Sequence, residues 1–418
     1  MTYTLRNYQT ESVDAGVNFL LDGGDKNGLV VAPPGCGKSL IIANIVQRLK
    51  APCIIFQPTK EILTQNFAKF VSYGYKPAVF SAALGERRVG DITLATIGSV
   101  YKQPELFQHV KYVIIDECHS CNAKDDNTMY MQFINALNGV REIKKIAESA
   151  GIKWNRPDGI GGVRVLGLTA SPYRLVTDGY GGSILKFLTR TRPRVFHKVV
   201  HVVQNGDLFR AGYLAKIDYK VVKTGFNRGR LRLNSTGADY TDESVRNHFK
   251  ELNFSDQIVR CVNRLFELKR GNSIVFTRFV EEAEYVASKI PGAAVITTKS
   301  GSRDRDNIVS AFKAGRIPCV CNVGVLGIGF DYPELKNVIL ARPTMSLAVF
   351  YQQVGRCVRT HPSKDCAFVV DMVGLSEQFG KVEDLTVVEG DHEKWFIESN
   401  GKQLTNVYYG ERHGRPQW

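Results

Sequence analysis

Short runs of apolar, mostly β-branched residues recur along the chain, separated by longer helical or polar stretches. The first series lies at residues 29–32, 53–56, 92–96, 112–115 and 163–168, and a second series lies at residues 273–277, 293–297, 319–323, 338–341 and 367–371. Continuous apolar strands that alternate with helices are typical of parallel sheets covered on both faces. The pattern therefore predicts an α/β protein with two tandem parallel-sheet lobes.

The two series also predict the domain boundaries. We expect the first lobe at residues 1–176 and the second at residues 253–375. Between them, residues 177–252 are rich in Gly and Arg and predict strands, turns and a basic linker or insert. Residues 376–418 lose the periodicity, but they carry Trp395, Phe396, Tyr408, Tyr409 and Trp418, so we expect this tail to pack back on the body.

Composition narrows the class of protein. With 418 residues and 44% hydrophobic content the chain can bury sizeable cores, which excludes a disordered or fibrous protein. Its 55 Lys and Arg against 41 Asp and Glu give a net charge of +14, which favours a polyanionic partner. We found no apolar run of about 18 residues and no signal-peptide pattern, and nine scattered cysteines suit reduced thiols. These features predict a cytoplasmic protein that does not enter the membrane.

The segment APPGCGKS, residues 32–39, follows an apolar run and precedes the helical run LIIANIVQRL. It fits the phosphate-loop pattern G-x-x-x-x-G-K-[ST], with Ala at the first position. Gly35 and Gly37 let the backbone N–H groups face a phosphate. Lys38 supplies a positive charge to the β- and γ-phosphates, and Ser39 offers a hydroxyl to Mg²⁺. The motif predicts nucleotide binding by Pro34, Gly35, Cys36, Gly37, Lys38, Ser39 and Leu40.

The segment YVIIDECH, residues 112–119, places two acids at the end of an apolar strand. Asp116 can hold Mg²⁺, and Glu117 can orient or deprotonate the attacking water. Beside a phosphate loop, these acids predict nucleotide hydrolysis rather than a solvated strand end.

With these two motifs in place, residues 3–375 resemble superfamily 2 helicases of the DECH-box type, and more narrowly the RadD-like branch of bacterial DNA repair helicases. The resemblance implies two RecA-like lobes with a nucleotide cleft between them, and ATP and Mg²⁺ as cofactors. In TLRNYQTE, residues 4–11, it assigns Arg6 and Gln9 to the adenine edge, and a Gln amide can donate and accept hydrogen bonds at once. The chain departs from the family in a longer segment at 140–162 and in ending without a Cys-rich extension.

The resemblance assigns further residues of the first lobe. FQPTKEILTQN (56–66) and LATIGSV (94–100) are similar to nucleic-acid motifs, which implies phosphodiester contacts by Thr59, Lys60, Thr96 and Ser99. The alternative for each is an ordinary cap. LTASPYR (168–174) looks like the coupling motif, which implies that Thr169 and Ser171 hydrogen-bond the DECH carboxylates. His119 is expected to contact groups at the lobe interface.

In the second lobe, SIVFTRFVEEAE (273–284), NVGVLGIGFDYPE (322–334) and ARPTMS (341–346) resemble family motifs. Gly329 would permit close approach of the nucleotide, and Asp331 would reach the ribose or a neighbouring arginine. The residues that the resemblance places near nucleic acid are Thr277, Arg278, Asn322, Val323, Thr344 and Ser346.

QQVGRCVR, residues 352–359, is the most diagnostic motif of this lobe. We expect Gln352, Arg356 and Arg359 to lie on roughly one helical face, from which the arginines reach the γ-phosphate across the cleft. A permanently charged, planar guanidinium stabilises the negative charge that spreads during phosphoryl transfer.

Three further segments have competing interpretations. CHSC (118–121) suggests zinc, but zinc needs about four ligands and no second Cys/His pair at suitable spacing follows nearby. KFLTRTRPRVFHKVVH (186–201) carries five Lys and Arg without an acid, which favours nucleic-acid contact over a solvated face, with Phe187 and Phe196 more readily explained as core than as stacking residues. LFRAGYLAKIDY (208–219) predicts a helix that stops at Gly212 and a strand that enters the second lobe.

The sequence therefore predicts a monomeric, ATP-dependent DNA helicase or translocase that acts on single-stranded or branched DNA in repair, recombination or replication. We expect it near the nucleoid, or in the host cytoplasm if a phage encodes it. One rival is an RNA-directed or duplex-tracking ATPase that does not separate strands. Another is a regulatory module that binds nucleotide and a protein partner.

Overall fold

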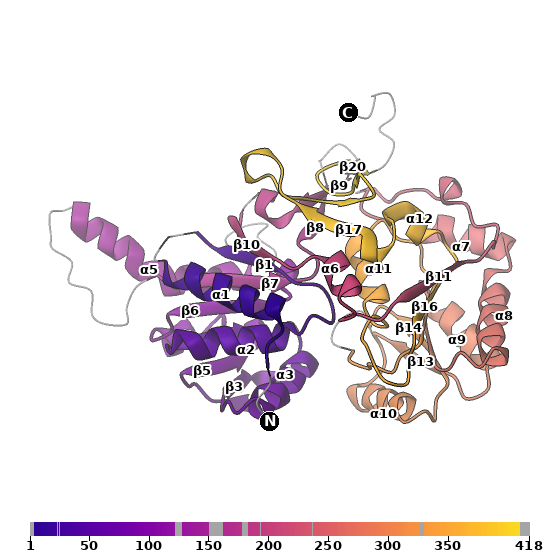
Figure 1. Ribbon diagram of the computed structural model, residues 1–418, viewed down its shortest axis with the longest axis horizontal. Helices are drawn as coiled ribbons and strands as arrows, with labels where there is room; N and C mark the ends of the chain where they lie inside the picture. The colour runs from indigo at the N-terminus through magenta and orange to yellow at the C-terminus, as the bar shows by residue number, and fades with distance from the viewer. Residues whose placement is uncertain are drawn as a thin grey trace. The chain divides into compact units, whose positions relative to one another are not determined.

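The computed structural model describes residues 4–22, 24, 26–121, 128–149, 162–177, 183–192, 194–235, 237–325 and 330–409. The chain divides into two compact units (Figure 1). Unit 1 contains Met1–Arg174, Phe187–Gln204 and Glu389–Trp395, and unit 2 contains Leu175–Lys186, Asn205–Val388 and Phe396–Trp418.

Unit 1 is built on an eight-stranded sheet in the order β10-β1-β7-β6-β2-β5-β3-β4. The described strand pairs are parallel except for β3 with β4. The strands are β1 (Gly28–Val31), β2 (Cys53–Phe56), β3 (Ala78–Ser81), β4 (Glu86–Arg87), β5 (Ile92–Ala95), β6 (Tyr112–Asp116), β7 (Arg164–Thr169) and β10 (Lys198–Val202). The helices are α1 (Asn7–Leu21), α2 (Lys38–Leu49), α3 (Lys60–Ser72), α4 (Ile97–Val100) and α5 (Met129–Ser149). Because β7 lies between β1 and β6, the loops that follow these three strands meet at one edge of the sheet.

Unit 2 is built on a parallel six-stranded sheet in the order β11-β16-β15-β12-β14-β13. Its strands are β11 (Ile217–Val221), β12 (Ser273–Phe276), β13 (Ala294–Thr297), β14 (Cys319–Val323), β15 (Asn337–Leu340) and β16 (Ala367–Asp371). Its helices are α6 (Asn205–Arg210), α7 (Asp242–Glu251), α8 (Phe254–Glu267), α9 (Val280–Lys289), α10 (Ser302–Lys313), α11 (Leu347–Val354) and α12 (Leu375–Phe379).

Two small sheets complete the chain. One contains β17 (Leu385–Val388), β18 (Phe396–Ser399) and β19 (Lys402–Gln403), and its strand pairs are antiparallel. The other contains β8 (Tyr173–Thr177), β9 (Ser183–Phe187) and β20 (Tyr408–Tyr409).

The structure confirms the α/β class and each of the ten strands predicted from the apolar runs. The prediction of a helix that stops before Gly212 and a strand that enters the second lobe is confirmed by α6 and β11. The range 177–252 does not form a separate body, since β10 joins the sheet of unit 1, β11 joins the sheet of unit 2 and α7 packs on α8. The tail packs back as β17 to β20, while part of the 140–162 segment and residues 410–418, including Trp418, lie outside the described residues.

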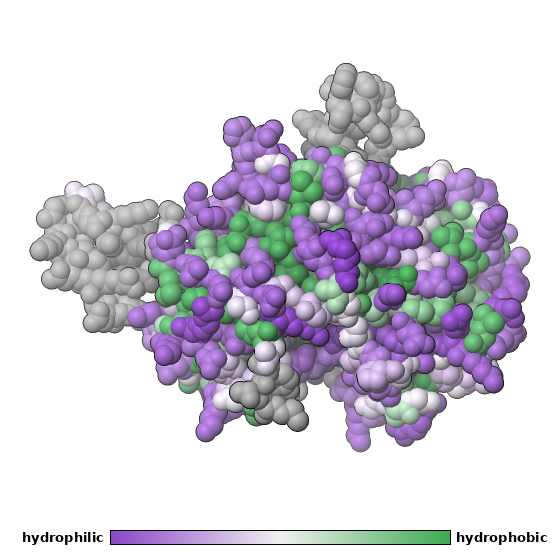
Figure 2. Space-filling model, viewed as in Figure 1, coloured by the Kyte–Doolittle hydropathy of each residue, from purple (hydrophilic) through white to green (hydrophobic). Residues whose placement is uncertain are grey.

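The surface is largely hydrophilic on the face that Figure 2 shows, over both units. Large exposed apolar side chains such as Leu21, Val71 and Leu268 lie on different elements. Among the described helices, none is long and apolar enough to cross a membrane. All nine cysteines are free thiols.

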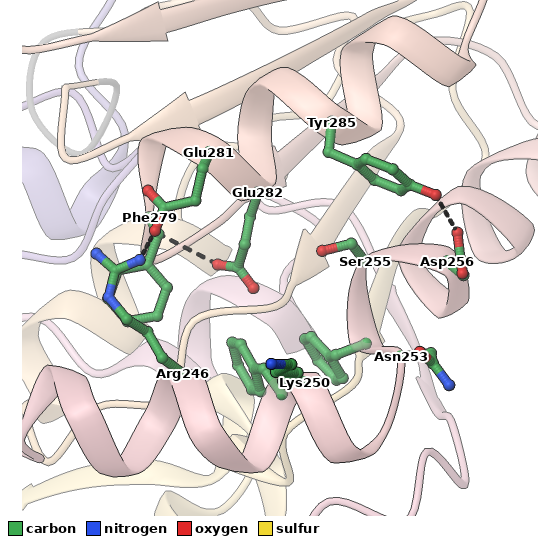
Figure 3. Close-up of a pocket in the computed structure, with 11 residues that line it drawn as sticks. Arg246, Lys250, Asn253, Ser255, Asp256, Phe279, Glu281, Glu282 and Tyr285 are labelled. Atoms are coloured by element: carbon green, nitrogen blue, oxygen red, sulfur yellow. Dashed lines mark hydrogen bonds and ion pairs between the residues drawn. The ribbon is translucent and has the colours of Figure 1, made fainter.

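A pocket of about 440 Å³ lies between α7, α8 and α9 (Figure 3). Phe249 and Phe254 line it and stack with their ring centroids 4.1 Å apart, and Arg246 lies over the ring of Phe279. Glu282 points from α9 toward α7 and is 7% exposed. One of its oxygens accepts a hydrogen bond from Phe279 N at the start of α9, while burial raises the pKa of Glu282 to about 7.

The replacement Glu282→Gln is expected to stabilise unit 2 at pH 8 by about 3 kcal/mol, on the scale of 1.36 kcal/mol per unit of pKa. The folded carboxyl holds its proton up to about pH 7, whereas the unfolded one loses it near pH 4.5. The folded state therefore binds more protons in this window, and wild-type stability falls as the pH rises through it. Urea unfolding at pH 5 and pH 8 measures the effect, with Glu281→Gln, an exposed neighbour, as control. An equal pH dependence in Glu282→Gln and wild type would contradict the assignment.

Candidate nucleotide site

The phosphate loop joins β1 to α2 at the sheet edge defined above. Gly35 and Gly37 have φ angles of +80° and +83°, a left-handed backbone that Gly adopts without steric cost. A Cβ atom at Gly37 would lie 2.6 Å from Nε2 of Gln9, so no other residue fits there without a shift. Gly37 is also the N-cap of α2, so the free N–H groups of this helix begin at the loop. Pro34 and Cys36 are buried, and Leu40 lies in the first turn of α2.

Lys38 and Glu117 form an ion pair, with 3.1 Å between Nζ and Oε1. Burial alone would lower the pKa of Lys38, but the Glu117 carboxylate raises it above its ordinary value. Burial alone would raise the pKa of Glu117, but Lys38 and His119 hold it well below its usual range. Glu117 is therefore an anion at neutral pH, as a group that orients or activates water requires.

Glu117 also has an unusual backbone. Its φ and ψ are +48° and +48°, the left-handed conformation that a residue with a side chain adopts at a cost of about 1–2 kcal/mol. Its N–H donates to Oδ1 of Asp116 at 3.0 Å. The turn after β6 thus directs the two neighbouring carboxylates to different partners.

Asn66 links the two residues predicted to hold magnesium. Its amide oxygen accepts from Ser39 Oγ at 2.6 Å, and its amide nitrogen donates to Asp116 Oδ2 at 3.2 Å and to Gln57 Oε1 at 2.7 Å. Burial and the neighbouring Glu117 raise the pKa of Asp116 to about 6, so a nearby cation would favour its charged form. A hydroxyl and a buried carboxylate held by one amide are the hard oxygen donors that Mg²⁺ prefers, so the donor set fits this ion.

The coupling residues lie beside Glu117. His119 Nδ1 lies 2.8 Å from Thr169 Oγ1 and 3.3 Å from Glu117 Oε2, and Thr169 Oγ1 lies 3.4 Å from the same carboxylate oxygen. Ser171 donates its backbone N–H to Thr169 Oγ1, whereas its hydroxyl is buried without a hydrogen-bond partner among the described residues. The predicted Thr169 contact is therefore present, and the predicted Ser171 contact with the carboxylates is absent.

Arg174 was not among the predicted site residues. Its guanidinium donates to the carbonyl oxygens of His119 and Cys121 at 2.6 and 2.5 Å. It therefore fixes the turn that carries His119.

Gln9 lies against the phosphate loop. It is 6% exposed, its Nε2 donates to Cys36 O at 2.9 Å, and its Oε1 accepts from Arg6 N at 2.9 Å. Both ends of the amide thus bond the protein, and Arg6 is exposed beside it. The adenine contact stays a prediction, for which the second N–H and the second lone pair of the Gln9 amide are the available groups.

The residues of unit 1 that were predicted to contact nucleic acid make helix-capping and turn hydrogen bonds in this structure. Thr59 caps α3 by accepting from Ile62 N at 3.3 Å, and Lys60 is the first residue of that helix. The hydroxyls of Thr96 and Ser99 lie 2.8 Å apart, and Ser99 Oγ accepts from Ala82 N at 2.9 Å. Their contact with phosphodiester stays a prediction.

In unit 2, the corresponding candidates are mostly buried. Thr277, Asn322 and Thr344 are each 1% exposed. Asn322 Oδ1 accepts from Val325 N, and Thr344 Oγ1 accepts from Ser346 N. Val323 ends β14, and Ser346 caps α11 by accepting from Val349 N at 3.3 Å.

The arginine motif differs from its prediction. Helix α11 ends at Val354, so Gln352 is helical but Arg356 and Arg359 follow the helix, and the expectation of one helical face is wrong. Gly355 has low helix propensity, and the chain tightens after it into bonds from Arg356 N to Gln353 O and from Cys357 N to Val354 O.

The segment 330–331 holds both guanidinium groups. Arg356 Nη1 donates to Phe330 O at 2.9 Å, and Arg359 forms an ion pair with Asp331. The expected contact of Asp331 with a neighbouring arginine is present. Gly329 lies outside the described residues.

Phe187 and Phe196, in the basic segment 186–201, are 0% and 1% exposed. Phe196 packs against Gly167, where an added Cβ would lie 2.6 Å from its ring. Both phenylalanines are therefore core residues, which confirms the prediction that they belong to the core rather than stack on bases.

Comparison with known proteins gives two family matches. Residues 2–174 match the model described as "Type III restriction enzyme, res subunit", and residues 256–361 match "Helicase conserved C-terminal domain". The chain is 23% identical over 82% of its length to a 51.5 kDa protein of a Lactococcus phage, of which it covers 65%. It is 24% identical over 85% of its length to the DNA 3'-5' translocase XPB2 of Sulfurisphaera tokodaii, of which it covers 78%.

A solved structure, "ATP-dependent Type ISP restriction-modification enzyme LlaBIII bound to DNA", aligns with a TM-score of 0.58 at 15% identity, covering 89% of this chain and 28% of that chain. At this identity the likeness shows the fold alone. The two parallel-sheet units are RecA-like domains of the kind found in such two-lobe proteins.

Proposed function

Because the two matched models indicate a superfamily 2 helicase, we propose that this chain couples ATP hydrolysis to movement along DNA and to its remodelling. The observation that carries the proposal is the grouping of Lys38, Glu117, Thr169 and His119 at one sheet edge, beside the pair Ser39 and Asp116. The sequence Asp-Glu-Cys-His at 116–119 supports the narrower DECH-box, RadD-like branch.

In the proposed reaction, the phosphate-loop N–H groups and Lys38 bind the β- and γ-phosphates. Ser39 and Asp116 would hold Mg²⁺, which supplies positive charge to the phosphate oxygens. Glu117 orients the attacking water and accepts its proton. Since Lys38 pairs with Glu117 in this structure, phosphate binding transfers Lys38 to the nucleotide and leaves Glu117 available to the water.

Coupling is proposed to run through Thr169 and His119. Both contact the carboxylate of Glu117, so a change at the γ-phosphate alters their hydrogen bonds. Arg174 passes that change to the backbone, because its guanidinium joins the turn that carries His119 to the segment after Ser171.

Arg356 and Arg359 are proposed as the cations of unit 2 that stabilise the transferring phosphoryl group. In this structure Arg356 binds Phe330 O and Arg359 binds Asp331, so the two guanidinium groups contact neighbouring residues of one short segment. Removal of Arg356 should therefore lower turnover more than it lowers ATP affinity.

DNA is the proposed track. The net charge of +14 supports a nucleic-acid partner, and two of the compared proteins are described as a DNA translocase and as an enzyme bound to DNA. The rivals are an RNA-directed or duplex-tracking ATPase and a nucleotide-binding regulatory module.

Steady-state ATP hydrolysis, measured alone and with single-stranded, forked, duplex and RNA substrates, tests the proposal. We expect single-stranded or forked DNA to stimulate turnover. Stimulation by RNA or by duplex alone would favour the first rival, and ATP binding without hydrolysis would favour the second. A rate of ATP hydrolysis that no nucleic acid changes would contradict the proposal that the protein moves along nucleic acid.

A further inference from the structure

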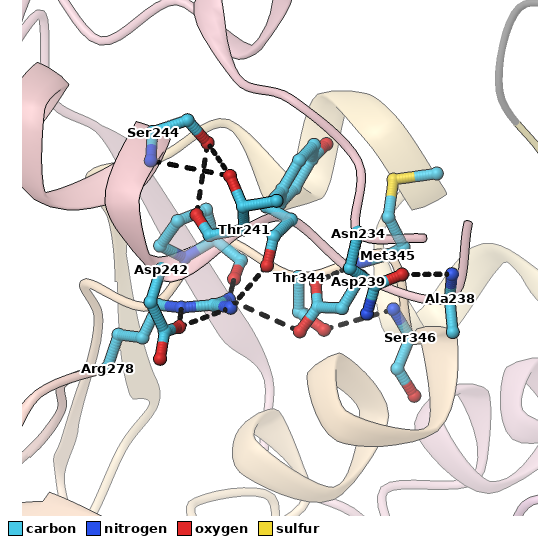
Figure 4. A network of polar contacts seen from close by, with 12 residues as sticks. Asn234, Ala238, Asp239, Thr241, Asp242, Ser244, Arg278, Thr344, Met345 and Ser346 are labelled. Atoms are coloured by element: carbon cyan, nitrogen blue, oxygen red, sulfur yellow. Dashed lines mark hydrogen bonds and ion pairs between the residues drawn. The ribbon is translucent and has the colours of Figure 1, made fainter. Parts of the chain in front are cut away.

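A cluster of opposite charges lies in unit 2 where β12 and β15 end (Figure 4). Arg278 is 9% exposed and forms ion pairs with Asp239 and Asp242, which are 25% and 66% exposed. Arg278 also donates to Tyr240 O at 2.7 Å and Pro343 O at 3.2 Å. A guanidinium predicted to contact nucleic acid is thus enclosed by an acidic segment of its own chain.

Asp239 uses both of its oxygens in this cluster. One accepts from Arg278 Nη1 at 3.2 Å, and the other accepts from the backbone N–H of Met345 at 3.2 Å. A guanidinium and a backbone N–H are donors that proteins use to bind phosphate oxygens of nucleic acids. The two oxygens of Asp239 therefore accept from Arg278 and from Met345 N–H as the two free oxygens of a phosphodiester would.

The charges balance only while Asp239 is present. Arg342 is also close to the cluster: burial lowers its pKa, and Asp239 raises it. The Nε of Arg342 is buried without a hydrogen-bond partner among the described residues. Without Asp239, two guanidinium groups would face the single carboxylate of Asp242, which leaves a net positive site.

Short-range bonds hold the segment that carries Asp239. Asn234 N donates to Asp239 O at 2.8 Å, Ala238 N donates to Asn234 Oδ1 at 3.0 Å, and Leu233 pairs with Tyr240 as an isolated bridge. Beyond Asp239, this turn is held by Tyr240, whose carbonyl oxygen accepts from Arg278 and whose side chain is 7% exposed, and by the ion pair of Asp242 with Arg278. An anion that binds Arg278 therefore competes with these polar contacts of the turn as well as with Asp239.

We propose that Arg278, the Met345 N–H and Arg342 form a phosphodiester-binding site that Asp239 fills until a nucleic-acid strand displaces it. The inference rests on the proposed function, because it names one contact of the proposed track. The acidic turn lowers the affinity of the resting protein for nucleic acid, so strand binding and movement of the turn become one event.

The variant Asp239→Asn tests this competition. Binding of fluorescent single-stranded DNA should tighten about tenfold, the size of one charge-assisted contact. The slope of log K against log salt should steepen, because in the variant the phosphate displaces no competing carboxylate from this site. The matched control is Glu243→Gln, which removes the same charge from an exposed pair with Arg232 and should leave the slope unchanged. Equal effects in both variants, or none in Asp239→Asn, would overturn the inference while the proposed function stands.

Hydrogen exchange on the unmodified protein gives a readout that does not depend on the variant folding. Adding single-stranded DNA should speed exchange in the segment 232–241. Unchanged or slower exchange there, with DNA bound, would overturn the inference alone. If inorganic phosphate speeds exchange in this segment as much as DNA does, the conclusion that a nucleic-acid strand is the ligand would be overturned. No DNA binding in any variant would overturn the inference and the DNA track together.

Discussion

Lys38→Ala is expected to lower ATP hydrolysis by at least about 10²-fold, the usual cost of removing one charged contact to a transferring phosphoryl group. Lys38 is the cation that ends the phosphate loop, and its Nζ lies 3.1 Å from Glu117 and 3.5 Å from Ala32 O. The variant loses the phosphate contact and also leaves the Glu117 carboxylate without its strongest neighbouring cation. Steady-state hydrolysis with and without single-stranded DNA measures the effect.

The matched control is Lys76→Ala, which removes an exposed lysine of the same unit. Far-ultraviolet circular dichroism of both variants should equal that of the wild type. Wild-type turnover in Lys38→Ala would remove the phosphate-site assignment, since no other residue of the loop carries a charge.

The sequence predicted the fold well because both central sheets are buried. A parallel strand covered on both faces must be apolar throughout, and β1, β2 and β12 are buried at every position. Strand β10 was not predicted because it lies at the sheet edge, where Lys198 is exposed and the pattern is mixed. The range 177–252 was interpreted as a linker for the same reason, since its strands β10 and β11 occupy edges of two different sheets.

The charged residues of the nucleotide site were predictable from the sequence, whereas the amide of Asn66 was not. A phosphate loop and an acidic strand end have fixed local spacing, so Lys38 and Glu117 were identifiable from the sequence. Asn66 was not, because its role depends on α3 passing beside both Ser39 and Asp116. Its position inside FQPTKEILTQN, a motif otherwise assigned to nucleic acid, was the available signal.

Arg278 and the arginine motif show a different limit. A motif identifies a guanidinium but says nothing about which carboxylates will reach it, and Asp239 comes from 39 positions earlier in the chain. The helical spacing of Arg356 and Arg359 failed because Gly355 tightens the turn, an effect that residue spacing alone does not reveal. Distant partners and local backbone geometry therefore account for most of what the sequence left open in the site.

Glu117→Gln is expected to lower hydrolysis by about 10²–10³-fold while ATP still binds, because glutamine keeps the size of the side chain but cannot accept the proton of the attacking water. In this structure Glu117 pairs with Lys38, so ATP must compete with the carboxylate for that lysine. The neutral amide weakens this competition. ATP affinity in the variant should therefore equal or exceed that of the wild type, and single-turnover hydrolysis with equilibrium binding of a fluorescent ATP analogue separates the two effects. Glu105→Gln, an exposed carboxylate of the same unit, should change neither quantity. A parallel loss of binding and hydrolysis in Glu117→Gln would instead assign Glu117 to the architecture of the phosphate loop, and the residue that activates water would have to be sought elsewhere.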